Sequence, residues 1–118
     1  MTELLESIIG VPGRLEAEVA CADQDLRAFV TVTSFKKKEL LGGEQRFAYF
    51  PESQMLFKVA RYQVDADLLE NESDVSEREL IDLQSIVLPD KARLLVILEM
   101  WLPSLEDLSV PQMSAAPY

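Results

Sequence analysis

The spacing of apolar residues near the amino terminus predicts a short helix. Between Thr2, which can cap a helix, and Gly10, which can end one, the apolar residues recur on one side at helical spacing. The run Val11-Pro12-Gly13 then has the composition of a turn. A helix of about two turns is marginal by itself, so we expect it to pack on the rest of the chain.

The pattern changes at Arg14 to a period of two, which predicts strands. A turn at residues 22–25 and a segment rich in β-branched residues at 26–35 predict a second strand after the first. In the first strand the inward residues are Leu15, Ala17, Val19 and Cys21, and the solvated side carries Arg14, Glu16, Glu18 and Ala20.

A hairpin is predicted between residues 45–50 and 55–64, which are joined by a loop at 51–54. In that register Phe50 lies opposite Met55. The other face of the hairpin is unusually aromatic and has a basic rim. These candidate partner-binding residues are Phe47, Tyr49, Leu56, Lys58, Arg61 and Tyr62.

Residues 65–82 contain eight acids and one base and show no strand alternation. The first half of this segment predicts an exposed loop, and the capping-box spacing of Ser76 and Glu79 predicts a short helix through residues 80–83. The candidate acidic surface consists of Asp65, Asp67, Glu70, Glu72, Asp74, Glu77 and Glu79.

Residues 86–102 allow two interpretations. We favour a second hairpin, in which a turn at 89–91 leads into a central strand at 92–102 that is apolar on both faces. The alternative is a buried helix from Lys91 to Leu102 with Asp90 as its cap. Beyond Pro103, Ser104 can cap a short helix, and residues 109–118 predict a flexible tail.

These elements define an α+β domain. We expect an antiparallel sheet of five to six strands with short N-terminal, middle and C-terminal helices packed on it. A chain of 118 residues that is 48% hydrophobic can bury one core, so residues 1–108 are predicted to form a single domain.

The charge balance narrows the range of partners. The formal net charge is -10, which disfavours nucleic acid and anionic membranes and favours a protein partner, including a basic one. Residues 36–64 have a net charge of +3 and lie between segments of -4 and -9. Acidic residues near the amino terminus, short apolar runs and a single cysteine predict a cytoplasmic protein that is not inserted in a membrane.

The sequence offers little catalytic chemistry. It contains no histidine, so Cys21 has no imidazole to stabilise a thiolate and is expected to be buried. The acidic segment lacks the glycine and the final glutamate of a calcium-binding loop. Glu99 is the one acid set in a long apolar run, and we expect it to pair with a base. We therefore predict no enzymatic activity, no cofactor and no metal.

Two functions from different classes remain. The first is a protein-binding adaptor, regulator or chaperone that uses the aromatic hairpin face to bind another protein or a second copy of the chain. The alternative is an inhibitor or immunity-type protein whose acidic segment at 65–82 blocks a basic partner. The competing structural interpretation is that a short helix simply covers the aromatic face.

Overall fold

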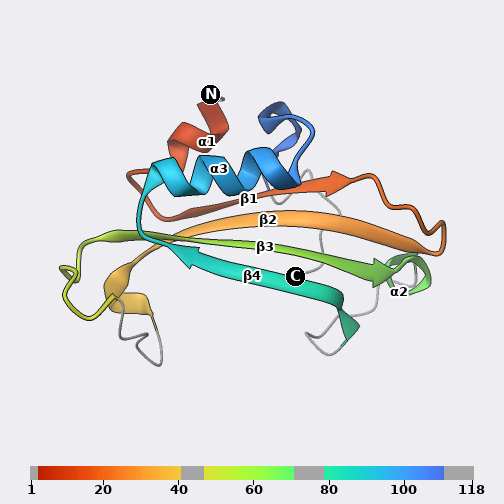
Figure 1. Ribbon diagram of the computed structural model, residues 1–118, viewed down its shortest axis with the longest axis horizontal. Helices are drawn as coiled ribbons and strands as arrows, with labels where there is room; N and C mark the ends of the chain where they lie inside the picture. The colour runs from red at the N-terminus through yellow and green to blue at the C-terminus, as the bar shows by residue number, and fades with distance from the viewer. Residues whose placement is uncertain (1–2, 41–46, 71–78, 111–118) are drawn as a thin grey trace.

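Four antiparallel strands form the sheet of the computed structural model, which describes residues 3–40, 47–70 and 79–110 (Figure 1). Each strand pairs with the next one along the chain, so the order in the sheet is β1-β2-β3-β4. The α+β class with an antiparallel sheet is confirmed, and the described sheet has four strands rather than five to six. The strands are β1 (Gly13–Val19), β2 (Leu26–Lys36), β3 (Met55–Asp65) and β4 (Ile81–Leu88).

The helices are short except for α3, and two of them lie on one face of the sheet (Figure 1). Residues of α1 and α3 belong to the same hydrophobic cluster as the sheet residues beneath them, whereas α2 follows directly from the end of β3. The helices are α1 (Glu3–Ser7), α2 (Ala66–Glu70) and α3 (Lys91–Trp101), with 3-10 turns η1 (Lys37–Glu39) and η4 (Leu105–Asp107).

The main core lies between α1, α3 and the sheet. Leu94 and Leu98 of α3 are 0% exposed, and they are four residues apart, so they lie one above the other on the sheet-facing side of the helix. They pack with the inward residues of the strands. The strand residues of this core are Leu15, Ala17, Val30, Val32, Phe57, Val59 and Leu88.

The opposite face of the sheet has a smaller core at the end near α2. Phe29, Tyr62 and Val64 are buried there, and Leu68 of α2 packs against them together with Leu80 and Leu83. The rings of Phe29 and Tyr62 are tilted, with centroids 5.8 Å apart. A short helix therefore covers part of the face that the sequence predicted to be an aromatic surface.

Glu16 corrects the prediction that its side of β1 is solvated, because its side chain is buried. Its Oε1 accepts a hydrogen bond of 2.7 Å from Nε of Arg14, and its Oε2 is buried with no hydrogen-bond partner among the described residues. The backbone of Ser109 pairs with that of Glu16 in both directions, at 2.8 and 2.9 Å. Ser109, which we expected in a flexible tail, thus lies against β1, while residues 111–118 are outside the described residues.

The predicted hairpin of residues 45–50 with 55–64 is wrong. β3 pairs with β2 along its whole length, from Leu26 opposite Asp65 to Lys36 opposite Met55, and β4 occupies its other edge. No edge of β3 is left for Phe47–Phe50, which form a turn instead. The sequence could not show that β2, which ends 19 positions before β3 begins, takes this edge of β3; residues 45 and 46 are outside the described residues.

The preferred strand at 92–102 is also wrong, and the alternative helix is correct. Oδ1 of Asp90 accepts a hydrogen bond of 2.8 Å from the backbone N–H of Arg93 and so caps α3. Conversely, the helix predicted through residues 80–83 is part of strand β4. The N-terminal helix, the first two strands and the cap at Ser104 are confirmed.

Candidate functional site

A pocket of about 630 Å³ opens where α3 ends above the sheet. Its position follows from element lengths: a helix of 11 residues is about 16 Å long, whereas strands of 11 residues reach about 36 Å. α3 therefore leaves one end of β2 and β3 uncovered. The residues that line the pocket are Val19, Ala20, Ala28, Phe29, Val30, Arg61, Tyr62, Gln63, Asp82, Leu83, Gln84, Trp101 and Pro103.

Two neighbours hold the Arg61 side chain in the pocket. Arg61 and Gln84 are directly opposite on β3 and β4, and Nε of Arg61 donates a hydrogen bond of 2.7 Å to Oε1 of Gln84. The guanidinium carbon lies 4.9 Å from the ring centroid of Trp101, within the range of a cation–π contact. A planar cation is thus fixed at the border between the helix end and the sheet.

The backbone of β4 is irregular where it enters the pocket. Asp82 has a φ of 53°, the one positive value among the non-glycine residues that the structure describes. The register between β3 and β4 shifts between Arg61 and Gln63, beside this residue. Aspartate tolerates the left-handed region better than most residues, although the conformation still carries strain. Such local strain often marks a binding site.

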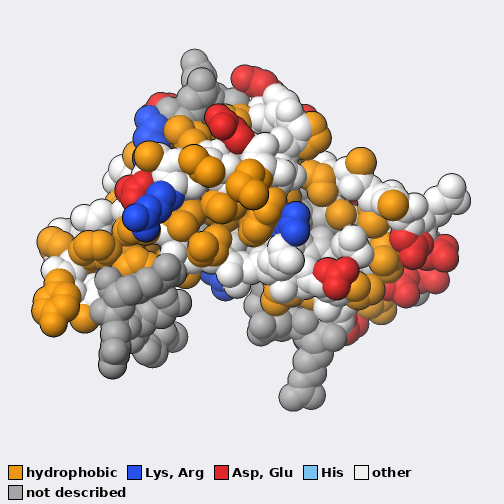
Figure 2. Space-filling model, in the orientation of Figure 1, with side chains coloured by type: hydrophobic (Ala, Val, Ile, Leu, Met, Phe, Trp, Pro, Cys, Tyr) orange, Lys and Arg blue, Asp and Glu red, His pale blue; other side chains and the backbone are white. Residues whose placement is uncertain are grey.

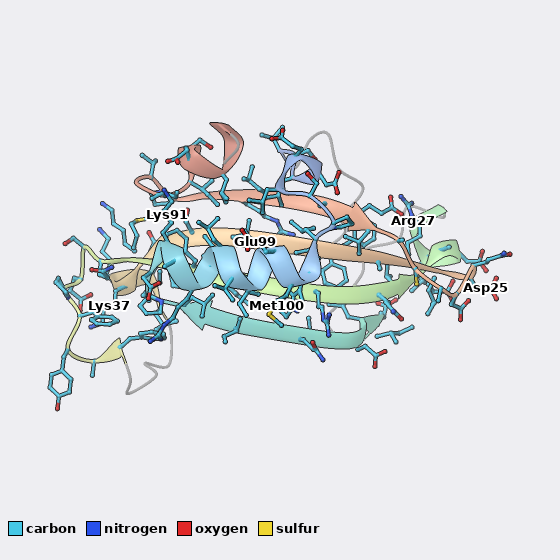
Figure 3. The ribbon with its side chains drawn as sticks, turned by 45° about the horizontal axis from the view of Figure 1, so that its top comes forward. Asp25, Arg27, Lys37, Lys91, Glu99 and Met100 are labelled. Carbon is cyan, nitrogen blue, oxygen red and sulfur yellow. The ribbon has the colours of Figure 1, made fainter. Side chains whose placement is uncertain are left out.

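The outer side of α3 is apolar and faces solvent. Val96 and Met100 are four residues apart and are 57% and 71% exposed, and Ala92 precedes them at the same spacing. We call Ala92, Val96 and Met100 the α3 stripe. Hydrophobic side chains gather over α3 in Figure 2, and Figure 3 shows Met100 on the side of the helix toward β4.

The structure does not bring the predicted aromatic residues into one exposed surface. Of the four apolar candidates for partner binding, Phe47, Leu56 and Tyr62 are buried, and Tyr49 is exposed, at 97%. The two basic rim residues lie on opposite faces of the sheet, because they are an odd number of positions apart on β3. Of the six residues, Arg61 and Tyr62 line the pocket, and Lys58 is exposed on the other face.

Those residues of the candidate acidic surface that the structure describes lie at one end of the sheet. Asp65 and Asp67 are exposed at the junction of β3 and α2. The turn between β1 and β2 lies beside them, since the backbone N–H of Ala66 donates to the carbonyl of Asp25 at 2.9 Å. Acidic side chains gather at this end in Figure 2. Glu79 is exposed, whereas the side chain of Glu70 and residues Glu72, Asp74 and Glu77 are outside the described residues.

The two residues considered for catalysis lie apart from the pocket. Glu99 is exposed on α3 and Cys21 is half-buried in the turn after β1, so the expectation of a fully buried cysteine is wrong. In the ranges that the structure describes, no group of three acidic or cysteine side chains is placed to hold a metal ion. The described helices include none with the length and apolar character that a membrane span requires.

Sequence reasoning missed the residues that complete the pocket, namely Trp101, Gln84 and Asp82. Trp101 is the sole tryptophan of the chain and stands just before Pro103, which could have drawn attention to it. Its contact with Arg61 depends on α3 being a helix. Comparison with protein-family models, with characterised proteins and with solved structures finds no match for this chain.

Proposed function

We propose that this chain is a non-catalytic, cytoplasmic protein-binding domain of the adaptor, regulator or chaperone type. The observation that carries the proposal is the α3 stripe, where Val96 and Met100 expose most of their apolar side chains on a well-anchored helix. Exposed apolar patches bordered by polar groups are typical of protein interaction sites. The aromatic turn at 47–50, by comparison, exposes Tyr49 but buries Phe47.

The helix is suited to docking because its position is fixed. Leu94 and Leu98 are fully buried beneath the stripe, so a partner would bind without first ordering the backbone. The net charge of -10 favours a partner with a basic rim around an apolar centre. The binding mode would be the docking of a helix face against a complementary groove or helix.

Site-specific photo-crosslinking in the native cells tests this proposal. A photoreactive phenylalanine derivative replaces Met100, and the same group replaces Gln24, an exposed residue in the β1–β2 turn, as the matched control. We expect one discrete adduct from position 100 that excess unmodified protein suppresses. An adduct that adds 13.3 kDa would identify a second copy of the chain. Equal adducts from both positions, or none from position 100, would contradict the proposal.

The alternative is an inhibitor or immunity-type protein that blocks a basic partner through its acidic end. The specific observation that favours it is the junction of Asp65 and Asp67 with the turn that carries Asp23 and Asp25. Attraction between exposed charges is screened by salt over about 8 Å at physiological ionic strength. A captured partner that dissociates steeply with added salt supports this alternative, and salt-independent binding supports docking on the α3 stripe.

A further inference from the structure

The pocket at the end of α3 has the features of a binding site with its own ligand chemistry. Its volume of about 630 Å³ is within the usual range for small-ligand sites, about 300–1,000 Å³. Apolar side chains of Val19, Ala28 and Val30 form part of its lining, and Trp101 and Pro103 close the helix side. A ligand that fills it needs an apolar body.

Arg61 is the one cationic side chain among the described residues of the lining. Its Nε donates to Gln84, and its guanidinium carbon lies 4.9 Å from the centroid of the Trp101 ring. Within the part of the chain that the structure describes, no group accepts a hydrogen bond from its Nη atoms. With Nε engaged by Gln84, the two Nη groups remain as donors, and such a pair of guanidinium N–H groups matches the two oxygens of a carboxylate.

The charge of the ligand is limited by the rest of the molecule. Asp82 also lines the pocket, so the described part of the lining carries one positive and one negative side chain. The protein has a net charge of -10, which disfavours a dianion such as a phosphate group. A single carboxylate is the anion that one guanidinium can neutralise.

We infer that this pocket binds a monocarboxylate attached to an apolar body, with the carboxylate on Arg61 and the body between Trp101 and the sheet. Such a group can come from a small organic acid or from the C-terminal residue of a polypeptide. The inference does not depend on the α3 stripe being a protein-docking surface, because the pocket and the stripe involve different side chains.

The experiment uses the fluorescence of Trp101, which reports on this pocket alone because the chain has one tryptophan. The full chain is titrated with N-acetyl-leucine and, as a matched probe without the charge, N-acetyl-leucinamide. A second arm uses a short glycine-serine peptide that ends in leucine, with a free or an amidated C terminus. We expect the free acids to bind about tenfold or more tightly than the amides.

Two substitutions on β3 provide the matched comparison. Arg61→Gln and Lys58→Gln each remove one exposed positive charge from the same strand, but only the first changes the pocket. Arg61→Gln should abolish the preference for acid over amide, and Lys58→Gln should preserve it. Asp82→Asn removes the negative charge from the lining and should tighten binding of the acids several-fold. Circular dichroism and thermal unfolding confirm that each variant is folded.

The outcomes separate the ligand sources and can overturn the inference. Binding of both acids identifies a pocket that accepts small carboxylates, and binding of the free-acid peptide alone identifies recognition of a polypeptide terminus. Equal responses to acids and amides, no response to either acid, or an unchanged preference in Arg61→Gln would each overturn it. None of these results bears on the crosslinking from position 100, so failure of this inference and failure of the proposed function are distinguishable.

Discussion

The face of the sheet on which α1 and α3 pack is covered by these helices at one end and exposed to solvent at the other. At one end α1 and α3 cover the strands, and Leu94 and Leu98 are fully buried against them. At the other end the strands continue beyond α3 (Figure 3), and the sheet meets solvent in a pocket whose lining includes Arg61 and Trp101. The covered end contains the main hydrophobic core, whereas the open end exposes polar side chains, including Arg61 and Gln84.

The difference between the two ends comes from the lengths of α3 and the strands, and it creates a pocket without a dedicated loop. The helix is shorter than the strands beneath it, so its last residue, Trp101, borders a pocket whose base is the sheet, including the irregular part of β4 at Asp82. Substitutions at the covered end should therefore change stability strongly, and substitutions at the open end should change it little.

The largest expected effect is the loss of Leu98 from the covered end. Leu98→Ala removes a fully buried side chain between α3 and the sheet, which should lower the free energy of unfolding by about 2–5 kcal/mol. Met100→Ala, on the exposed side of the same helix, should change it by less than about 0.5 kcal/mol. Urea denaturation of the two variants measures this difference, and similar losses would show that α3 is not packed as described.

A smaller effect is expected where α1 meets the start of β1. A Cβ atom at Gly13 would lie 2.7 Å from Cγ2 of Ile8, which is itself buried and has little room to move. Gly13→Ala should therefore cost about 1–3 kcal/mol. Gly10→Ala is the control, because no heavy atom lies within 4 Å of its added Cβ. A thermal melt in which the two alanine variants behave alike would contradict this packing.

The cap of α3 should contribute less than its buried face. Asp90→Ala removes the acceptor for the Arg93 backbone N–H, with an expected loss of about 1 kcal/mol, whereas Asp90→Asn should retain most of the cap. Chemical denaturation of both variants tests this. If asparagine is as damaging as alanine, the contribution of Asp90 is its charge rather than its hydrogen bond.

The smallest effect is expected on the opposite face of the sheet, where Arg27 and Glu18 form an ion pair at the surface. Nε of Arg27 donates to Oε2 of Glu18 at 2.7 Å. That hydrogen bond lowers the pKa of Glu18 below its ordinary value of 4.5, partial burial opposes the shift, and attraction to the Arg27 charge adds to it. Because the pair lies at the surface, with side chains 34% and 43% exposed, solvent screens its attraction, and Glu18→Gln should cost less than about 1 kcal/mol at neutral pH.

The sign of this pH dependence follows from the lowered pKa. The folded protein binds the Glu18 proton more weakly than the unfolded chain, so the stabilisation is complete above the unfolded pKa near 4.5 and is lost as pH falls through the folded value. The difference in stability between wild type and Glu18→Gln should thus shrink on acidification. A difference that grows at low pH would reverse this assignment.

Much of the fold could be predicted from local sequence patterns. The alternation in β1 and β2, the N-terminal helix and the cap at Ser104 are correct because their signals lie within about ten residues and no distant segment competes for them. The pocket could not be predicted in the same way, because it depends on contacts between residues far apart in the sequence. Arg61 was named as a rim residue of a hairpin, but its contacts with Gln84 and Trp101 join residues that are 23 and 40 positions apart.

What the sequence determined by itself is the α+β class, the acidity and the identity of the strands with clear alternation. Tertiary structure alone decided three further features: which strand pairs with β3, whether residues 91–101 are helix or strand, and which aromatic residues are buried. The physical reason is the same in each case. The apolar residues of α3 show little one-sided spacing, so its pattern fits either a helix or a strand. Packing on the sheet selects the helix, with Leu94 and Leu98 facing the sheet. Val96 and Met100 are left exposed to solvent.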